Sequence, residues 1–339
     1  MTDATDTLMI AAIQHEYGGA ETISTGRIPV PAPGPKDVLI HVEAAAINPA
    51  DVFLMRGVPR VLRLGSGLRR PRNPVRGSDA AGTVMEVGAS VVGLSRGDRV
   101  FGAARGSLAQ YATATAARLA RLPDAVPPEH AAAVGMAGLA ALHGLRAGGL
   151  EPVGAKPGGL ESGARVLVNG ASGGIGHLAV QLAAARGAHV TAVCSTRNVD
   201  WVRDLGAYRV VDYTRESLLD LGERFDLVFD NVGNHRIREM LALVADGGTL
   251  LPNSGVPGPD GGPMTRVAKA QWINLVTRGR RVTTFVSAPH REDLESLASM
   301  VAAGTLRPHL DTVFALTEAS AALDRVAGHH AAGKVVVTP

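Results

Sequence analysis

The sequence contains very little cysteine, few aromatic residues and no long apolar run. One cysteine in 339 residues excludes a disulfide framework and any zinc site built from several cysteines. Only 4% of the residues are aromatic, so Ala, Val and Leu must form most of the core. No segment approaches the ~20 consecutive apolar residues of a membrane span, and the N-terminus lacks the features of a signal peptide. We therefore expect a cytoplasmic protein that does not bind membranes.

The charge balance gives no sign of a nucleic-acid partner. There are 34 Lys and Arg against 31 Asp and Glu, a net charge of +3, and no basic face with interleaved aromatic residues is apparent. One dense basic group stands out, formed by Arg60, Arg63, Arg69, Arg70, Arg72 and Arg76. Charge runs usually face water, so we expect a solvated loop, with an anion-binding element as the alternative.

The hydrophobic pattern changes along the chain and predicts an α/β fold. Up to about residue 125, short apolar segments such as 37–43 and 82–88 lie between Gly and Pro residues, as in a small, strongly bent β domain or barrel. From Gly163, apolar strands alternate with helical segments, which indicates βαβ units and a parallel sheet. A strand near 281–286 could close that sheet.

The segment GASGGIG follows the predicted strand Arg165–Asn169 and precedes a predicted helix. In a dinucleotide site, Gly173 lets the backbone approach a pyrophosphate, Gly176 lets the helix pack on the strand, and the helix N-terminus supplies N–H groups. Ala171 stands where the usual motif has its first glycine. The alternative is a glycine-rich turn without a ligand. The predicted cofactor-binding residues of this turn are Ala171, Ser172, Gly173, Gly174, Ile175 and Gly176.

The end of the following strand indicates which dinucleotide is bound. NAD sites usually place an acidic residue ~20 residues after the glycine motif, to bind the ribose 2′-hydroxyl. Here Ser195 and Arg197 occupy that stretch, and no acidic residue comes before Asp200. A hydroxyl and a guanidinium suit a 2′-phosphate, so NADPH is predicted over NADH. The alternative roles are an ordinary helix cap and a surface charge.

Several motifs occur in order over most of the chain and together resemble one family. They are YGGAETI, AAAINPADVFLMRG at 44–57, GSDAAGTVMEVG at 77–88, GDRVFG at 97–102, GASGGIG, VVDY, FDLVFDNVG at 225–233 and GKVVV. The chain resembles the zinc-independent quinone oxidoreductase and enoyl reductase-like branch of the medium-chain dehydrogenase/reductase superfamily. The resemblance implies a GroES-like β-barrel catalytic domain (1–125 and 288–339), a Rossmann NADPH-binding domain (126–287), and a cleft between them for the nicotinamide.

The resemblance also implies further cofactor residues and an oligomeric state. Tyr213 matches a family tyrosine beside the adenosine ribose, with packing at the sheet edge as its alternative. Ligands of open α/β sheets gather at the carboxyl ends of strands. Residues expected at two such ends are Asn231, Val232, Gly233, Ser254 and Gly255. Lys334 is expected in solvent, with a cofactor phosphate as the alternative. A homodimer is expected through the sheet edge near 283–286.

Ligand counting predicts no metal. Zinc-binding relatives have a Cys where this chain has Asn48 and a His-Glu pair where it has Ser78 and Asp79. The resemblance therefore implies substrates that accept hydride without a Lewis acid: quinones, or α,β-unsaturated carbonyls reduced at the conjugated C=C. Two alternatives remain open: a tailoring enoyl reductase acting on an acidic or thioester-bound polyketide-like substrate, and a non-catalytic NADPH-binding protein.

The family's active-site loop contains three candidate residues. Asn48 is the candidate to orient nicotinamide or substrate, with a turn before Pro49 as its alternative. Asp51 and Phe53 are assigned to the substrate pocket, Asp51 more as a hydrogen-bonding group than as an acid and Phe53 as an apolar wall. The tyrosines that some relatives carry at or shortly after this loop are absent, which leaves solvent or an unidentified group as the proton donor.

Overall fold

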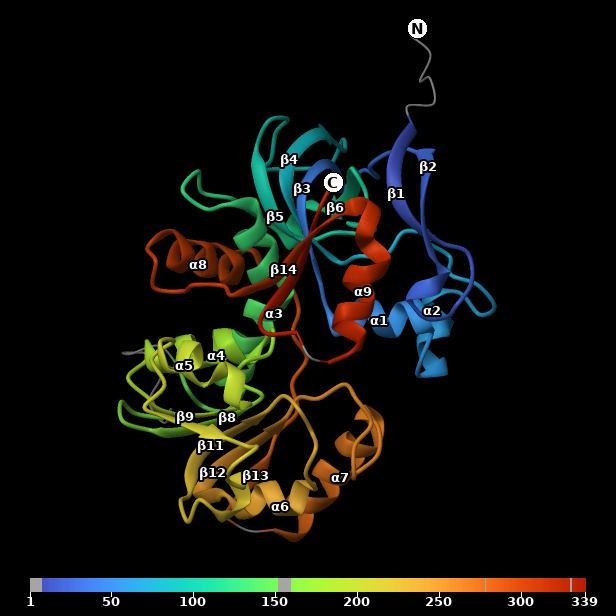
Figure 1. Cartoon of the computed structure of the whole chain (residues 1–339). Helices are drawn as coiled ribbons and strands as arrows, with labels where there is room; N and C mark the ends of the chain where they lie inside the picture. The colour runs from blue at the N-terminus through green and yellow to red at the C-terminus, as the bar shows by residue number, and fades with distance from the viewer. Residues whose placement is uncertain (1–7, 152–159, 278, 330) are drawn as a thin grey trace, which may run out of the picture. The chain divides into compact units, whose positions relative to one another are not determined.

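The computed structural model describes residues 8–151, 160–277, 279–329 and 331–339, and the chain divides into two compact units (Figure 1). Unit 1 comprises Met1–Leu139, Ala288–Gly304 and Pro308–Pro339, and unit 2 comprises Ala140–Ser287 and Thr305–Arg307. Unit 1 is therefore assembled from the N-terminal and C-terminal parts of the chain. Helix α3 (Pro128–Ala147) begins in unit 1 and ends in unit 2.

Unit 1 is built on β-strands. Strands β1 (Leu8–Gln14) and β2 (Ile23–Pro29) form an antiparallel pair. A seven-stranded sheet has the order β14-β15-β3-β4-β5-β7, with β6 also paired to β3. Its strands are β3 (Asp37–Ile47), β4 (Asp79–Val87), β5 (Arg99–Ala103), β6 (Tyr111–Thr115), β7 (Leu119–Arg121), β14 (Leu310–Ala315) and β15 (Lys334–Thr338). Because β15 pairs with β3, the end of the chain is hydrogen-bonded to its first third.

Short helices complete unit 1 around an aliphatic core. They are α1 (Pro49–Arg56), α2 (Arg63–Ser66), α8 (Arg291–Ala302) and α9 (Ala319–Ala327). The main core of this unit consists almost entirely of Ala, Val, Leu and Ile, such as Ile40 and Leu119. This agrees with the low aromatic content, since burial of many aliphatic side chains supplies the same kind of hydrophobic stabilisation.

Unit 2 is a parallel sheet with helices on both faces. The strands are β8 (Arg165–Asn169), β9 (His189–Cys194), β10 (Arg209–Asp212), β11 (Phe225–Asp230), β12 (Val244–Pro252) and β13 (Arg281–Val282). Figure 1 shows α4 (Gly176–Ala184) and α5 (Val199–Arg203) on one face, and α6 (Ile237–Ala242) and α7 (Pro263–Val276) on the other. The strand that we expected near 281–286 is formed only by its first two residues.

The strand order of unit 2 is β10-β9-β8-β11-β12-β13, with every neighbouring pair parallel. In order of appearance this is 3-2-1-4-5-6, the doubly wound order of dinucleotide-binding folds, whose direction reverses between β8 and β11. The predicted α/β fold is thereby confirmed. No helix among the described residues has both the length and the apolar character needed to cross a membrane.

Candidate functional site

The glycine-rich turn connects β8 to α4 at the point where the strand order of unit 2 reverses. A side chain at Gly176 would place its Cβ 2.1 Å from the carbonyl oxygen of Gly170, so only glycine allows α4 to start this close to the strand. At Gly173 the nearest atom to such a Cβ is the same oxygen, at 3.3 Å, so this position has more room. Gly176 thus serves packing, whereas Gly173 lies in the turn where a phosphate would approach.

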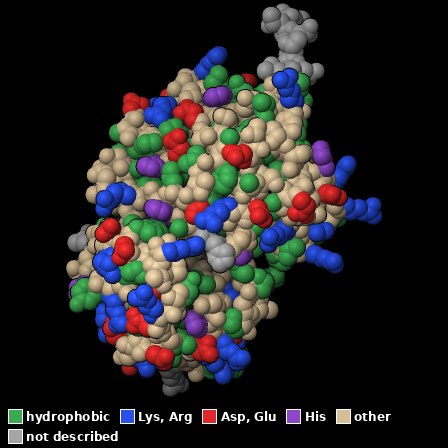
Figure 2. Space-filling view, viewed as in Figure 1, with side chains coloured by type: hydrophobic (Ala, Val, Ile, Leu, Met, Phe, Trp, Pro, Cys, Tyr) green, Lys and Arg blue, Asp and Glu red, His purple; other side chains and the backbone are tan. Residues whose placement is uncertain are grey.

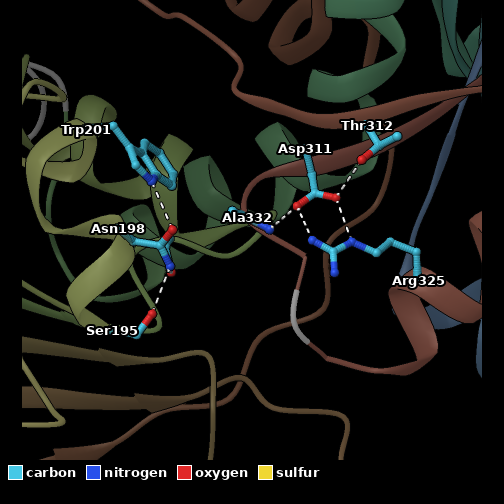
Figure 3. Close-up of polar contacts among 8 residues, drawn as sticks. Ser195, Asn198, Trp201, Asp311, Thr312, Arg325 and Ala332 are labelled. Carbon is cyan, nitrogen blue, oxygen red and sulfur yellow. Dashed lines mark hydrogen bonds and ion pairs between the residues drawn. The ribbon is translucent and has the colours of Figure 1, made fainter.

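A buried asparagine connects this turn to the end of β9 (Figure 3). Asn198 donates hydrogen bonds from Nδ2 to Ser172 Oγ at 3.1 Å and to Ser195 Oγ at 3.0 Å. Its Oδ1 accepts a hydrogen bond from Trp201 Nε1 at 3.0 Å, which fixes the orientation of the amide. Asn198 therefore holds two predicted cofactor residues in place. We did not predict this role, because the sequence contains no signal that distinguishes Asn198 from an ordinary polar residue.

The end of β10 places a carboxylate next to the segment 195–197, whose residues are predicted to favour NADPH over NADH. Asp212 pairs with Cys194 in the strand register, and its carboxylate accepts hydrogen bonds from the Thr196 and Thr214 hydroxyls at 2.7 and 2.8 Å. The Thr196 hydroxyl contributes most to a lowered pKa of Asp212. Arg197 is exposed, and Tyr213 is 61% exposed. Burial raises the pKa of the Cys194 thiol to about 11, which favours the thiol over the reactive thiolate.

The end of β11 carries an organised turn with an unused donor. Asp230 is buried and accepts hydrogen bonds from Asn169 Nδ2 and from the backbone N–H groups of Val232 and Gly233, at 2.8–3.1 Å. The neighbouring Asn231 accepts from Asn253 through Oδ1, but its buried Nδ2 has no hydrogen-bond partner among the described residues. A buried donor without an acceptor costs about 1–3 kcal/mol, which a bound ligand with an acceptor would relieve.

A buried arginine holds the last two predicted loops together. Arg266, on α7, donates to the carbonyl oxygens of Ser254 at 3.0 Å and Gly233 at 2.8 Å. The two loops follow β12 and β11, so this guanidinium fixes the carboxyl ends of two neighbouring strands. Nothing in the local sequence indicates this role, since Arg266 lies 33 residues from Gly233.

These observations fit a dinucleotide in unit 2. The close turn at Gly176, the N-terminus of α4 and the unpartnered Asn231 donor all lie at the carboxyl ends of the central strands. Doubly wound sheets bind their ligands at this edge. The residues predicted on β8, β9, β10, β11 and β12 are therefore brought to one edge of one sheet.

Asn48 lies in unit 1, where its side chain is clamped between two ionisable groups. It is 3% exposed and caps α1. Its Nδ2 donates to Asp79 Oδ2 at 2.8 Å, and its Oδ1 accepts from Lys334 Nζ at 2.6 Å. Lys334 Nζ also donates to the carbonyl oxygen of Ile47 at 3.0 Å. Both ends of the Asn48 amide are thus engaged within the protein.

Asp51 fixes the backbone of the same loop. Its carboxylate accepts from Asn48 N at 2.8 Å and from the hydroxyl of Ser78 at 2.8 Å, and the residue is 1% exposed. Asp51 is therefore a positioning residue in this structure. Phe53, on the same helix, is half-buried and remains the predicted apolar wall.

Burial dominates the electrostatics of this group. It raises the pKa of Asp79 to about 6 against the opposing effects of Lys334, Asn48 and the Met136 amide. It also raises the pKa of Asp51 and lowers that of Lys334, whose charged form is favoured by Asp79 and Asp51. Removing either sign of charge would leave the other buried without compensation.

Two sequence expectations are wrong here. We expected Lys334 in solvent, yet it is 3% exposed and bonded to Asn48. Arg76 was expected with the solvated arginines, but it is 6% exposed and donates to the carbonyl oxygen of Asn73. In both cases tertiary contacts bury a residue whose local sequence reads as polar surface.

The residues at the expected zinc-ligand positions do not suit a zinc ion. Asn48 offers an amide already used twice, Ser78 a hydroxyl, and Asp79 a carboxylate that accepts from Asn48 and from the Met136 amide. The ammonium of Lys334 lies in the same group and would repel a cation. Within the described ranges, no three His, Cys, Asp or Glu side chains form a group that could hold a metal. We derive no step through zinc.

Comparison with known proteins agrees with this architecture. The alcohol dehydrogenase GroES-like domain family matches residues 34–124, and the zinc-binding dehydrogenase family matches residues 205–337. The chain is 32% identical to the chloroplast envelope quinone oxidoreductase homolog of Arabidopsis thaliana, over 98% of this chain and 99% of that protein. It is 29% identical to the NADPH-dependent alkenal/one oxidoreductase of the same plant, over 98% of this chain and 80% of the relative.

A solved structure shows the same fold. The quinone oxidoreductase of Coxiella burnetii is 26% identical, covers 98% of this chain and 100% of its own, and superposes with a TM-score of 0.86. The family resemblance predicted from the motifs is confirmed. With its GroES-like part, its doubly wound sheet and full-length relatives, the chain belongs to the quinone oxidoreductase branch of the medium-chain dehydrogenase/reductase superfamily.

Proposed function

We propose that the protein is an NADPH-dependent oxidoreductase that transfers hydride, without zinc, to a quinone or to the conjugated C=C of an α,β-unsaturated carbonyl. The coarser statement, an NAD(P)H-dependent oxidoreductase of the quinone and alkenal reductase kind, follows from its family and relatives. The observation that carries the proposal is the set of polar groups at the carboxyl edge of unit 2, with the unpartnered donor of Asn231 among them.

In this proposal, the Rossmann domain that we predict at 126–287 contains the parallel sheet of unit 2 and holds the dinucleotide. Ser172, Gly173 and the N-terminus of α4 bind its pyrophosphate, and Ser195 and Arg197 bind the 2′-phosphate. Asn198 keeps Ser172 and Ser195 at a fixed separation. Arg266 keeps the Gly233 and Ser254 loops in place for the rest of the cofactor. The bound cofactor supplies hydride.

The GroES-like domain (1–125 and 288–339) orients the substrate. The buried Asp79–Asn48–Lys334 arrangement keeps the start of α1 rigid, and Phe53 offers an apolar surface to a flat acceptor. After hydride addition, negative charge collects on the carbonyl oxygen and requires a donor. The loop residues Asn48, Asp51 and Phe53 supply no tyrosine hydroxyl, so the proton comes from solvent or from a group outside this loop. A homodimer remains part of the proposal.

The test is oxidation of NADPH, followed at 340 nm, with 1,4-benzoquinone and with a simple alkenone as acceptors. We expect turnover with one of these classes that is insensitive to EDTA, and weaker turnover with NADH. Activity that disappears with EDTA and returns with zinc would overturn the zinc-free mechanism. Tight binding of NADPH without turnover of any acceptor would favour the non-catalytic alternative.

A further inference from the structure

We propose that the arginine-rich loop after α1 forms a recognition pocket for the negatively charged end of the substrate, a carboxylate or a phosphate. This inference rests on the proposed function and names its substrate class: anionic unsaturated carbonyls. The pocket has a volume of about 490 Å³ and lies wholly in unit 1. Its lining includes Gln14 and three exposed arginines, Arg69, Arg70 and Arg72.

The lining of this pocket is positively charged and has no acidic residue. Among the described residues, no carboxylate forms an ion pair with Arg69, Arg70 or Arg72. Other surface arginines of unit 1 do have such partners: Arg105 pairs with Asp37 and Arg121 with Asp98, and Arg325 binds Asp311 through two hydrogen bonds (Figure 3). In Figure 2, Lys and Arg side chains project from the edge of unit 1 where Figure 1 places α2.

The loop that presents the arginines is fixed by its own contacts. Gly67 has a φ of +118°, and a Cβ there would lie 2.1 Å from the carbonyl oxygen of Arg70, so the turn requires glycine. The Gly67 carbonyl accepts from the Tyr17 hydroxyl at 2.6 Å, and Arg72 N donates to Ser66 O at 2.7 Å. The backbone that carries these arginines is thus held in place before a ligand arrives, which reduces the entropy lost on binding.

Gln14 supplies a second observation that points to a ligand. Its side chain is fully buried, and in the part of the chain that the structure describes its Oε1 has no hydrogen-bond partner. The amide orientation is set by the other end, because Nε2 donates to Met55 O at 2.8 Å and to Thr22 Oγ1 at 3.1 Å. A buried acceptor without a donor costs about 1–3 kcal/mol, so a donor brought next to Gln14 by a ligand in the pocket that this residue lines would relieve that cost.

The position of the pocket sets a length for the substrate. Gln14 donates a hydrogen bond to the carbonyl oxygen of Met55 in the last turn of α1, whereas Asn48 is the N-cap residue of the first turn. A helix of this length measures about 12 Å. A substrate with its C=C near the start of α1 and its charged group in the pocket would need a chain of comparable length between the two, passing along Phe53.

The kinetic test uses a pair of enones that differ only in a terminal carboxylate or its methyl ester, each with a spacer of this length. We expect the double variant R70A/R72A to lower the ratio of kcat/KM for the acid to that for the ester at least tenfold, mainly through KM. The control variant R60A removes an arginine of the same cluster that does not line the pocket, and should keep the wild-type ratio. Equal losses on acid and ester would overturn the proposal.

A binding measurement separates this inference from the proposed reaction. Glutarate, a saturated dicarboxylate that cannot be reduced, is titrated by calorimetry into protein saturated with NADP⁺, so that the phosphate-binding turn is occupied. Binding that weakens at least tenfold in R70A/R72A supports the pocket even if no enone is reduced. Absence of glutarate binding, or equal binding to the wild type and the double variant, overturns the pocket whatever the fate of the reaction.

Discussion

Lys334 Nζ donates a 2.6 Å hydrogen bond to Asn48 Oδ1, joining the last strand of the chain to the start of α1. The bond belongs to a buried group in which Asp79 binds the other end of the same amide. At the positions where zinc-binding relatives have metal ligands, this chain has the Lys334 ammonium, hydrogen-bonded to the Asn48 amide. The carboxylates of Asp79 and Asp51 compensate its charge. The arrangement makes the loop rigid, and it makes each member sensitive to loss of the others.

The first prediction concerns the buried ammonium. Lys334→Met should lower the free energy of unfolding by about 3–5 kcal/mol at pH 7, because Asp79 and Asp51 then stay buried without a compensating cation. Urea denaturation followed by circular dichroism measures this change. Lys36→Met removes an exposed lysine of unit 1 and should change stability little. Equal denaturation midpoints for the two variants would contradict the role assigned to Lys334. The midpoint of Lys334→Arg should lie between those of Lys334→Met and Lys36→Met.

The second prediction concerns pH. The folded pKa of Asp79 is about 6, above the ordinary aspartate pKa of 3.8, so the folded protein binds this proton more tightly than the unfolded chain does. Its contribution to stability is therefore full below about pH 4 and is lost as pH rises to about 6, by at most about 3 kcal/mol. Asp79→Asn should not show this loss of stability between pH 4 and 6. The measurement is the free energy of unfolding of the wild type and the variant at several pH values from 4 to 7. A difference between the two proteins that stays constant over this range would refute the prediction.

Local signals in the sequence were sufficient to predict the parallel sheet and the glycine-rich turn between β8 and α4. Gly173 and Gly176 stand between a strand and a helix, and both the alternation of elements and the glycine spacing are visible within a few dozen residues. The family motifs are equally local, which is why the family could be identified before the structure was known.

The parts that the sequence did not reveal depend on contacts between distant residues. Lys334 and Asn48 are 286 residues apart, and nothing near Lys334 indicates that the strand it begins, β15, will pair with β3. Asn198 and Arg266 were missed for the same reason: each acts by joining loops that the fold brings together. The burial of Arg76 likewise follows from tertiary packing and not from its arginine-rich neighbourhood.

A third prediction separates the two glycines of the turn. Gly176→Ala should destabilise the protein by about 1–3 kcal/mol, since its Cβ would overlap backbone atoms of Gly170 and Ala171 that have no room to move. Gly173→Ala should retain the fold, because its Cβ meets only one atom at 3.3 Å, but should weaken NADPH binding. Thermal unfolding and a fluorescence titration of NADPH distinguish them. Loss of stability in Gly173→Ala alone would reverse the assignment.

The fourth prediction tests the choice of cofactor. Arg197→Ala should raise the KM for NADPH about tenfold or more and change that for NADH little, because a guanidinium bound to a 2′-phosphate contributes about 1.5–3 kcal/mol. The matched control is Arg203→Ala, which removes an exposed arginine of the neighbouring α5. The same change in KM for both cofactors would assign Arg197 to a general surface charge.

The last prediction concerns Arg266, whose guanidinium binds two carbonyl oxygens in different loops. Lysine carries a single point charge and cannot bridge Gly233 and Ser254 in the same way, so Arg266→Lys should free one loop while keeping the charge. We expect the dissociation constant for the dinucleotide to rise about tenfold, as one hydrogen bond to a charged group is lost. Arg224→Lys, at an exposed position of unit 2, is the control. If Arg266→Lys binds the dinucleotide as tightly as Arg224→Lys does, the two loops do not need this clamp, and the Asp230 turn alone must hold the Gly233 side of the site.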